Sequence, residues 1–268
     1  FEKQIKTLNL FIVGVGNVGG ILLNQIKKQQ DFLNENLLLN VRVVGISNSK
    51  KMIFEEEGID LNTWSEQLKK GKKQSHQSFF DTIKELNLSN SIFIDVTANE
   101  DVAKIYKNYL RESISVIACN KIACSSKYSD YKELKDLSRK YNASFLFETN
   151  VGAGLPVINT LNNLINSGDK VTSIQAVLSG SLNFIFNNFD EKSSFHDIVK
   201  QAQEEGYTEP DPRIDLSGVD VARKILILAR EAGYKLDLKD IKNQSFLPKE
   251  SLEAKTVDDF YNTLKAEA

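Results

Sequence analysis

The sequence predicts an α/β protein with a parallel β-sheet in its first half and a second, mixed α+β domain behind it. Two observations carry this prediction. Short apolar runs alternate with amphipathic segments over the first 148 residues, which is typical of parallel strands joined by helices. Beyond that point the alternation stops and helical patterns dominate. We therefore expect one domain over residues 1–148 and a second over residues 149–268.

The strands of the first domain are expected where apolar runs are short and continuous. The clearest is the run LNLFIVGV over residues 8–15, which is typical of a strand that is buried on both faces. Helices are expected where apolar residues recur at a spacing of three or four. The predicted strands cover residues 8–15, 41–46, 91–96, 115–118 and 144–147, and the predicted helices cover 19–30, 61–70, 78–86, 101–111 and 128–141.

The second domain is predicted to be mostly helical, with one strand over residues 171–178. Its last helix has no stop signal, so we expect the domain to be truncated at its C-terminus. The chain begins at Phe1 and its single methionine is Met52, which predicts a piece of a longer polypeptide. The predicted helices cover residues 154–167, 182–189, 194–205, 216–232 and 257–266.

Composition excludes several classes of protein. The 34 basic residues nearly balance the 36 acidic ones, so the basic excess of a dedicated nucleic-acid binder is missing. Every apolar run is far shorter than the roughly 20 residues that span a bilayer. Two cysteines and two histidines are too few for a disulfide framework or a zinc site rich in these residues. We expect a cytoplasmic protein, because a reducing compartment is the default for such a chain.

A glycine-rich motif follows the first predicted strand. Gly14, Gly16 and Gly19 match the GxGxxG pattern, with Asn17 and Val18 between the second and third glycines. The strand before it and the helix after it are the context in which this pattern binds the pyrophosphate of a dinucleotide. We therefore expect a doubly wound sheet of the Rossmann type, and NADP or NAD as cofactor. The alternative is a purely structural turn.

The second predicted strand ends without the acidic residue that usually binds the ribose of NAD. Ser49 and Lys50 stand there instead, and a hydroxyl and an ammonium group favour the 2′-phosphate of NADP. The alternative is that this lysine and its neighbour are ordinary solvated residues. The preference for NADP over NAD therefore stays open at this point.

Five further polar positions are candidates for chemistry. Asp220 and Lys224 are four residues apart and share a face of the strongest predicted helix, and Glu209 lies in the Pro-rich loop before it. The carboxylates are candidates for binding the ammonium group of an amino-acid substrate, and the lysine for proton transfer. An exposed ion pair explains the same spacing. Thr97 and Lys121 follow the third and fourth strands, at the sheet edge where open α/β folds bind ligands. From its position alone, Lys121 is better explained as a lysine at a helix start without a role.

These segments resemble homoserine dehydrogenase over nearly the whole chain. The resemblance is strongest in GYTEPDPRIDLSGVDVARK over residues 206–224, and residues 58–70 are most similar to the dehydrogenase region of bifunctional aspartokinase/homoserine dehydrogenase. It departs from the usual pattern at Cys119 and Ile214. The other similar segments are residues 11–20, 43–50, 120–121, 148–158 and 178–186.

The resemblance implies NAD(P)H-dependent reduction of L-aspartate 4-semialdehyde to L-homoserine, in the biosynthesis of threonine, methionine and isoleucine. It implies that Lys224 gives or takes the catalytic proton, that Lys121 lies near nicotinamide and substrate, and that Gly206 and Thr97 lie near the cofactor. It assigns substrate binding to Glu209 and Asp220. It also implies a homo-oligomer fused to an N-terminal aspartokinase, and in some members a Na⁺ ion. The residues that match the Na⁺ ligands are Glu148 and the carbonyls of Val151, Ala153 and Leu155.

Two other functions compete with this one. A truncated, non-catalytic module that binds NAD(P) or serves in assembly would carry the same glycine motif. Another Rossmann enzyme, such as an amino-acid dehydrogenase acting at carbon 2 or a SAM-dependent methyltransferase, has no need of the spacing of Glu209, Asp220 and Lys224. We expect turnover of aspartate semialdehyde to separate the first alternative from the enzyme.

Overall fold

A computed structural model describes residues 4–208 and 210–266. The chain divides into two compact units, Phe1–Leu155 and Pro156–Ala268. The boundary that the sequence predicts, between residues 148 and 149, lies a few residues earlier, just before the turn that ends the first unit. Each unit has its own core and is described by itself.

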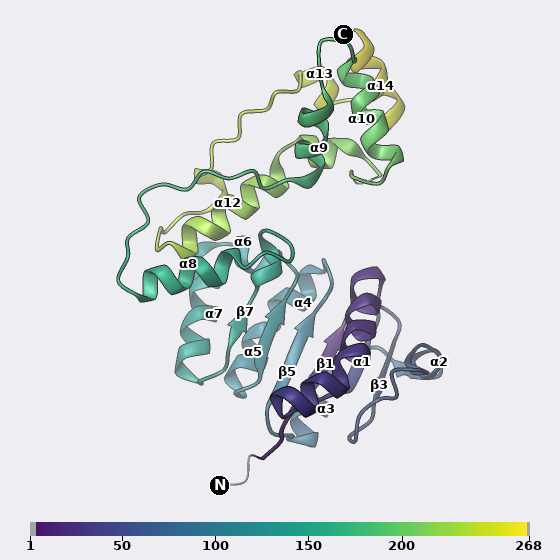
Figure 1. The fold of residues 1–268 in the computed structure, drawn as a ribbon, viewed down its shortest axis with the longest axis vertical. Coiled ribbons are helices and arrows are strands. Elements are labelled where there is room, and N and C mark those ends of the chain that lie inside the picture. Colours follow the sequence, from purple (N-terminus) through teal and green to yellow (C-terminus); the bar gives the residue numbers. More distant parts are fainter. Residues whose placement is uncertain (1–3, 209, 267–268) are drawn as a thin grey trace. The chain divides into compact units, whose positions relative to one another are not determined.

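Unit 1 is built on a seven-stranded sheet in the order β4-β3-β2-β1-β5-β6-β7 (Figure 1). The five strands that the sequence predicts form its parallel part, and the doubly wound prediction is confirmed. β1 (Lys6–Val13) lies at the centre, between β2 (Leu39–Ser47) and β5 (Ser91–Asp95). β6 (Ser115–Ala118) and β7 (Phe145–Leu146) extend the sheet on one side.

Residues of β1 alternate between two apolar layers, as its continuous apolar sequence predicts. Leu10 and Ile12 join a cluster with Leu23 of the first helix. Phe11 points to an aromatic cluster on the opposite face, where its ring lies 6.4 Å from that of Phe54. A strand with apolar side chains on both faces is stable only between two covering layers, so this central position follows from the sequence.

Helices and a short antiparallel excursion complete unit 1. β3 (Lys51–Phe54) and β4 (Lys72–Lys73), which the sequence pattern did not predict, run antiparallel at the edge beyond β2. The reversal depends on Asn48, whose side-chain oxygen accepts hydrogen bonds from the backbone N–H groups of Lys50 and Lys51. The helices are α1 (Asn17–Leu37), α2 (Trp64–Lys69), α3 (His76–Leu86), α4 (Glu100–Lys104), α5 (Tyr106–Arg111), α6 (Ile122–Ser125) and α7 (Tyr128–Lys140), followed by the 3₁₀ turn η1 (Glu148–Asn150).

Within its described residues, unit 2 contains helices and no strands. Its core packs Ile185, Ile198 and Leu216 against Phe260 and Leu264. Ser194 is the N-cap of α10, because its hydroxyl accepts from the N–H of Asp197. The elements are α8 (Val157–Asn166), α9 (Gly180–Asn188), α10 (Phe195–Glu204), α11 (Pro212–Leu216), α12 (Val219–Glu231), the 3₁₀ turn η2 (Leu238–Asp240), α13 (Lys249–Leu252) and α14 (Val257–Ala266).

Two predictions for unit 2 are wrong in detail. The expected strand over residues 171–178 is an irregular segment, because no other described segment pairs with it and a strand needs a hydrogen-bonded neighbour. The helix predicted over residues 216–232 is present as α12 but begins later, at Val219, and the short helix α11 lies mostly in the Pro-rich loop that the sequence predicted before it. Gly218 stands between them with φ of +74°, a left-handed conformation that suits glycine and ends the first helix.

None of the described helices is both long and apolar enough to cross a bilayer.

Candidate active site

The glycine turn between β1 and α1 has the geometry of a dinucleotide site. Gly14 has φ of +96°, and a Cβ atom there would lie 2.6 Å from the carbonyl oxygen of Val96. A Cβ at Gly19 would lie 2.0 Å from the carbonyl oxygen of Gly14, so this glycine allows α1 to pack closely against the strand. Gly16, by contrast, faces open space. These three environments match the three roles that the motif predicts.

The N-terminus of α1 suits the negative charge of a pyrophosphate. Gly16 is its N-cap residue and supplies no side chain to cap the first turn. Asn17 and Val18 form that turn, and Val18 is exposed. Backbone N–H groups at a helix start carry a partial positive charge and need acceptors. The residues present therefore fit NAD(P), which supplies hydride when bound.

The loop after β2 lies beside this turn, since the N–H of Gly14 donates to the carbonyl of Ser47 at 2.9 Å. Ser49 and Lys50 are exposed on it. The ammonium group of Lys51 instead donates to the carbonyl of Gly71 at 3.0 Å. Of the two neighbouring lysines, Lys50 is therefore the one that remains a candidate for binding a ribose 2′-phosphate.

A buried carboxylate organises the ends of β5 and β6. Asp95, the last residue of β5, accepts from the backbone N–H of Thr97 at 2.7 Å and from the amide of Asn120 at 3.1 Å. The hydroxyl of Tyr106 in α5 donates to the same carboxylate. Burial raises the pKa of Asp95, and these hydrogen bonds oppose the rise. Lys121 follows Asn120 directly and is the N-cap residue of α6.

The sequence pattern did not single out Asp95. An aspartate at the end of an apolar strand was a usable signal, since Asp is almost never fully buried unless it is paired. The partners of Asp95 come from α5 and from the loop after β6, so their identity depends on the fold.

The segment that was predicted to bind Na⁺ forms a tight turn at the end of unit 1. Glu148 begins η1, and Gly152 and Ala153 both have positive φ, at 83° and 51°. Carbonyl and carboxylate oxygens are hard ligands that suit such a cation. The residues present fit a cation on that ground.

In unit 2 the predicted pair of Asp220 and Lys224 forms on α12. The Lys224 ammonium lies 2.7 Å from the Asp220 carboxylate, and it also donates to the carbonyl of Leu178 at 2.8 Å. Only 18% of the Lys224 side chain is exposed, against 41% for Asp220. An ordinary surface ion pair would leave both side chains in water. The largely buried Lys224 therefore fits poorly with the alternative of an exposed ion pair.

A chain of hydrogen bonds next to Leu178 was not predicted. The hydroxyls of Ser179 and Ser181 lie 2.9 Å apart, and Ser181 donates to the Asp215 carboxylate at 2.9 Å. Ser179 also caps α9 by accepting from the N–H of Leu182. The segment of residues 178–186 and the acidic loop therefore meet in unit 2. Repeated serines beside a glycine were the only signal for this contact in the sequence.

The remaining predicted positions of unit 2 lie in or beside the acidic loop before α12. Glu209 lies outside the described residues. Gly206 is exposed after α10 with φ of +78°. The next part of the acidic loop is held by Arg213, which forms hydrogen bonds with Asp211 and donates to the carbonyl of Ala254. Arg213 lowers the pKa of Asp211. Ile214, where the resemblance expects an aspartate, is exposed.

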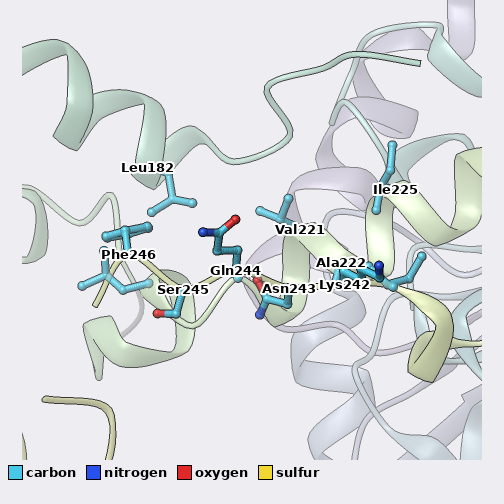
Figure 2. Close-up of a pocket in the computed structure, with 12 residues that line it drawn as sticks. Leu182, Val221, Ala222, Ile225, Lys242, Asn243, Gln244, Ser245 and Phe246 are labelled. Carbon is cyan, nitrogen blue, oxygen red and sulfur yellow. The ribbon is translucent and has the colours of Figure 1, made fainter. Parts of the chain in front are cut away.

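The other face of α12 lines a cavity of about 220 Å³ (Figure 2). Val221, Ala222 and Ile225 form its apolar side, and the loop over residues 241–246 forms its polar side. Neither Asp220 nor Lys224 lines it. The cavity and the lysine pair therefore belong to different faces of the same helix.

The matches to known families cover both units. Residues 14–148 match the homoserine dehydrogenase NAD-binding domain, and residues 156–267 match the homoserine dehydrogenase domain.

The chain belongs to the homoserine dehydrogenase family.

Members of this family that resemble the chain are fused to aspartokinase. The bifunctional aspartokinase/homoserine dehydrogenase 1 of Arabidopsis thaliana is 42% identical over 266 residues, which are 98% of this chain and 29% of that protein. The bifunctional enzyme of Haemophilus influenzae is 42% identical over 256 residues, which are 95% of this chain and 31% of that protein. The chain thus spans under a third of the length of these homoserine dehydrogenase relatives.

A solved structure supports the same fold and cofactor class. A mutant homoserine dehydrogenase from a hyperthermophilic archaeon, in complex with NADPH, superposes with a TM-score of 0.71 at 27% identity. The superposition covers 84% of this chain and 70% of the archaeal chain. The NAD-binding domain is therefore shown by sequence and by fold, whereas the residue roles within the homoserine dehydrogenase site stay predictions.

Proposed function

We propose that this homoserine dehydrogenase family member reduces L-aspartate 4-semialdehyde to L-homoserine with NADPH or NADH. The observation that carries the proposal is the position of Lys224. Its ammonium group has three N–H donors, and the carboxylate of Asp220 and the carbonyl of Leu178 are its two acceptors among the described residues. The third donor is the one that a substrate oxygen would use.

The chemistry follows from this arrangement. When hydride reaches the aldehyde carbon, the carbonyl oxygen gains negative charge and needs a proton. The Lys224 ammonium stabilises that charge and donates the proton, and Asp220 holds the ammonium in place. Lys121 is proposed to orient the substrate near the nicotinamide. Asp220 and Glu209 are proposed to bind the substrate ammonium.

The decisive experiment is NADPH oxidation followed at 340 nm with aspartate semialdehyde as substrate, in the full-length protein and in the 268-residue chain. Turnover by the full-length protein supports the proposal, and its absence under saturating substrate overturns it. NADPH binding without turnover would support the alternative of a non-catalytic module.

The finer parts of the proposal have their own support. The exposed Lys50 beside the glycine turn favours NADP over NAD. The carbonyls of Val151, Ala153 and Leu155 and the carboxylate of Glu148 lie in one tight turn, and such hard oxygen ligands favour a Na⁺ ion there. Replacing Na⁺ by a bulky organic cation in the assay tests this site, and Glu148→Gln should remove any Na⁺ dependence.

Assembly, fusion and location also remain proposals. We propose a homo-oligomer, tested by light scattering, and fusion to an aspartokinase, tested by sequencing the whole reading frame. Among the described residues neither Cys119 nor Cys124 forms a disulfide, which supports our proposal of a cytoplasmic location, and cell fractionation tests it.

A further inference from the structure

The carboxylate of Asp95, at the end of β5, accepts more hydrogen bonds than the end of a strand requires. Asp95 is fully buried, and three donors from different elements converge on its carboxylate: the Thr97 N–H, the Asn120 amide and the Tyr106 hydroxyl. Burying a carboxylate is costly unless it is well hydrogen-bonded. Three donors meet this cost, and they also tie α5 and the loop after β6 to the end of β5.

The side-chain amide of Asn120 fixes the backbone on both sides of Lys121. Its amide nitrogen donates to Asp95 and to the carbonyl of Asn99, at 3.1 and 2.9 Å. Its amide oxygen accepts from the N–H of Ile122 at 3.1 Å. Lys121 therefore stands between two residues whose backbone positions depend on one amide group, and that amide is anchored on Asp95.

Thr97 is held from the same carboxylate. Its N–H donates to Asp95, and its hydroxyl accepts from the N–H of Asn99 at 3.1 Å. The methyl group of Thr97 lies close to Gly14, where an added Cβ would approach it to 2.8 Å. The carboxylate thus connects two candidate site residues, Thr97 and Lys121, at the sheet edge next to the glycine turn.

We propose that Asp95 is a positioning residue, whose buried carboxylate holds Thr97 directly and Lys121 through Asn120 in the geometry that aldehyde reduction needs. This inference rests on the proposed function for its catalytic meaning, because Lys121 acts only if that reaction occurs. Asp95 itself does not touch the reacting atoms. Its charge acts through the residues that it orders.

Helix α5 offers a matched pair of variants. Tyr106 and Tyr109 are both fully buried, and both rings pack on Phe93. The Tyr106 hydroxyl donates to Asp95, whereas within the described residues the Tyr109 hydroxyl has no hydrogen-bond partner. Tyr106→Phe and Tyr109→Phe therefore remove the same group from equally buried sites, and only the first removes a donor from Asp95.

A misplacement of one ångström costs about 100-fold in rate. Tyr106→Phe leaves two of the three donors to Asp95 in place, so we expect a smaller loss, with kcat of the full-length protein lowered by about ten-fold. Tyr109→Phe should stay within about two-fold of the parent. Asp95→Asn should have a larger effect than Tyr106→Phe. When the oxygen of the new amide accepts from the Thr97 N–H, its NH₂ group faces the NH₂ group of Asn120, so two donors meet and that hydrogen bond is lost. In these variants the KM for NADPH should change little. NADPH should also bind at the parental stoichiometry, and this measurement excludes a loss of folded protein as the cause of a lower kcat.

A second measurement does not depend on turnover. Amide hydrogen exchange over residues 119–125 should become faster in Tyr106→Phe and stay parental in Tyr109→Phe. Equal exchange and equal kcat per NADPH site in the two variants would overturn the positioning role. A parent without turnover, in which the exchange difference persists, would overturn the proposed function and leave Asp95 as the anchor of this edge without a catalytic role.

Discussion

The two units hold their candidate site residues by different means. In unit 1 the glycine turn, Thr97 and Lys121 follow the ends of neighbouring parallel strands, so the sheet brings them to one edge, where Asp95 at the end of β5 holds Thr97 and, through Asn120, Lys121. In unit 2 the Lys224 side chain is held by a hydrogen bond to the backbone carbonyl of Leu178, and the Asp215 carboxylate by one from the Ser181 hydroxyl. We therefore expect substitutions that strain the packed backbone of unit 1 to lower its stability, whereas side-chain substitutions at the candidate site of unit 2 should change chemistry with less effect on stability.

The largest expected effect concerns Lys224. Lys224→Ala should lower kcat by about two to four powers of ten, which is the usual loss when a general acid is removed. The melting temperature should stay close to that of the parent. Lys235→Ala, which removes an exposed lysine just after α12, is the control and should keep parental kcat. A kcat of Lys224→Ala within a few-fold of the parent would show that another group supplies the proton.

The glycine turn tests the other side of the comparison. Gly19→Ala should lower the free energy of unfolding by about 2–3 kcal/mol, since its Cβ would lie 2.0 Å from the Gly14 carbonyl oxygen. Gly16→Ala meets no atom within 4 Å, so the unfolding free energy should change by less than about 1 kcal/mol. It should nevertheless weaken NADPH binding by about ten-fold, or roughly 1.4 kcal/mol. Urea denaturation and fluorescence titration measure the two effects, and equal destabilisation by both variants would contradict the assigned roles.

Stability in unit 2 should respond to pH through Asp211 and Arg213. Because Arg213 lowers the pKa of Asp211 in the folded state, the stabilisation is complete above the ordinary pKa of 3.8 and is lost as pH falls through the lowered value. Arg213→Met should cost about 1 kcal/mol at pH 7. Urea unfolding of both proteins from pH 7 down to pH 3 should show this difference shrinking. A difference that is constant with pH would mean that the contact of Arg213 with Ala254, and not the ion pair, carries the effect.

The smallest expected effect is on cofactor preference. Lys50→Ala should lower the ratio of kcat/KM for NADPH over NADH by about five-fold, or roughly 1 kcal/mol, because its ammonium group is exposed and screened. Lys72→Ala, on the exposed edge strand β4, is a comparable lysine and should leave the ratio unchanged. The same small change in both variants would indicate a general effect of surface charge and not a phosphate site.

The parallel core and the glycine turn could be predicted because their signals are local. A continuous apolar run predicts a strand buried on both faces, and Leu10, Phe11 and Ile12 do alternate between two cores. The edge strands β3 and β4 could not, because their sequence is short and rich in lysine and their reversal depends on the side chain of Asn48.

In unit 2 the apolar pattern located the helices but not all of their ends. The helix predicted from residue 216 begins at Val219, because Gly218 before it has a left-handed conformation, and the short helix α11 forms in a segment predicted as a loop. The segment over residues 171–178 is apolar enough for a strand, yet a strand depends on a partner as well as on its own sequence.

The sequence by itself determined the order of the parallel strands and of the helices between them in unit 1, the dinucleotide motif, and the pairing of Asp220 with Lys224, because each depends on neighbours a few residues away. The tertiary structure alone decided which groups constrain the site. Asp95 meets Asn120, and Lys224 meets Leu178, across 25 and 46 residues of chain. Contacts of that separation form only when the sheet and the helices have packed, since no local pattern encodes which side chain lies opposite a buried donor or acceptor.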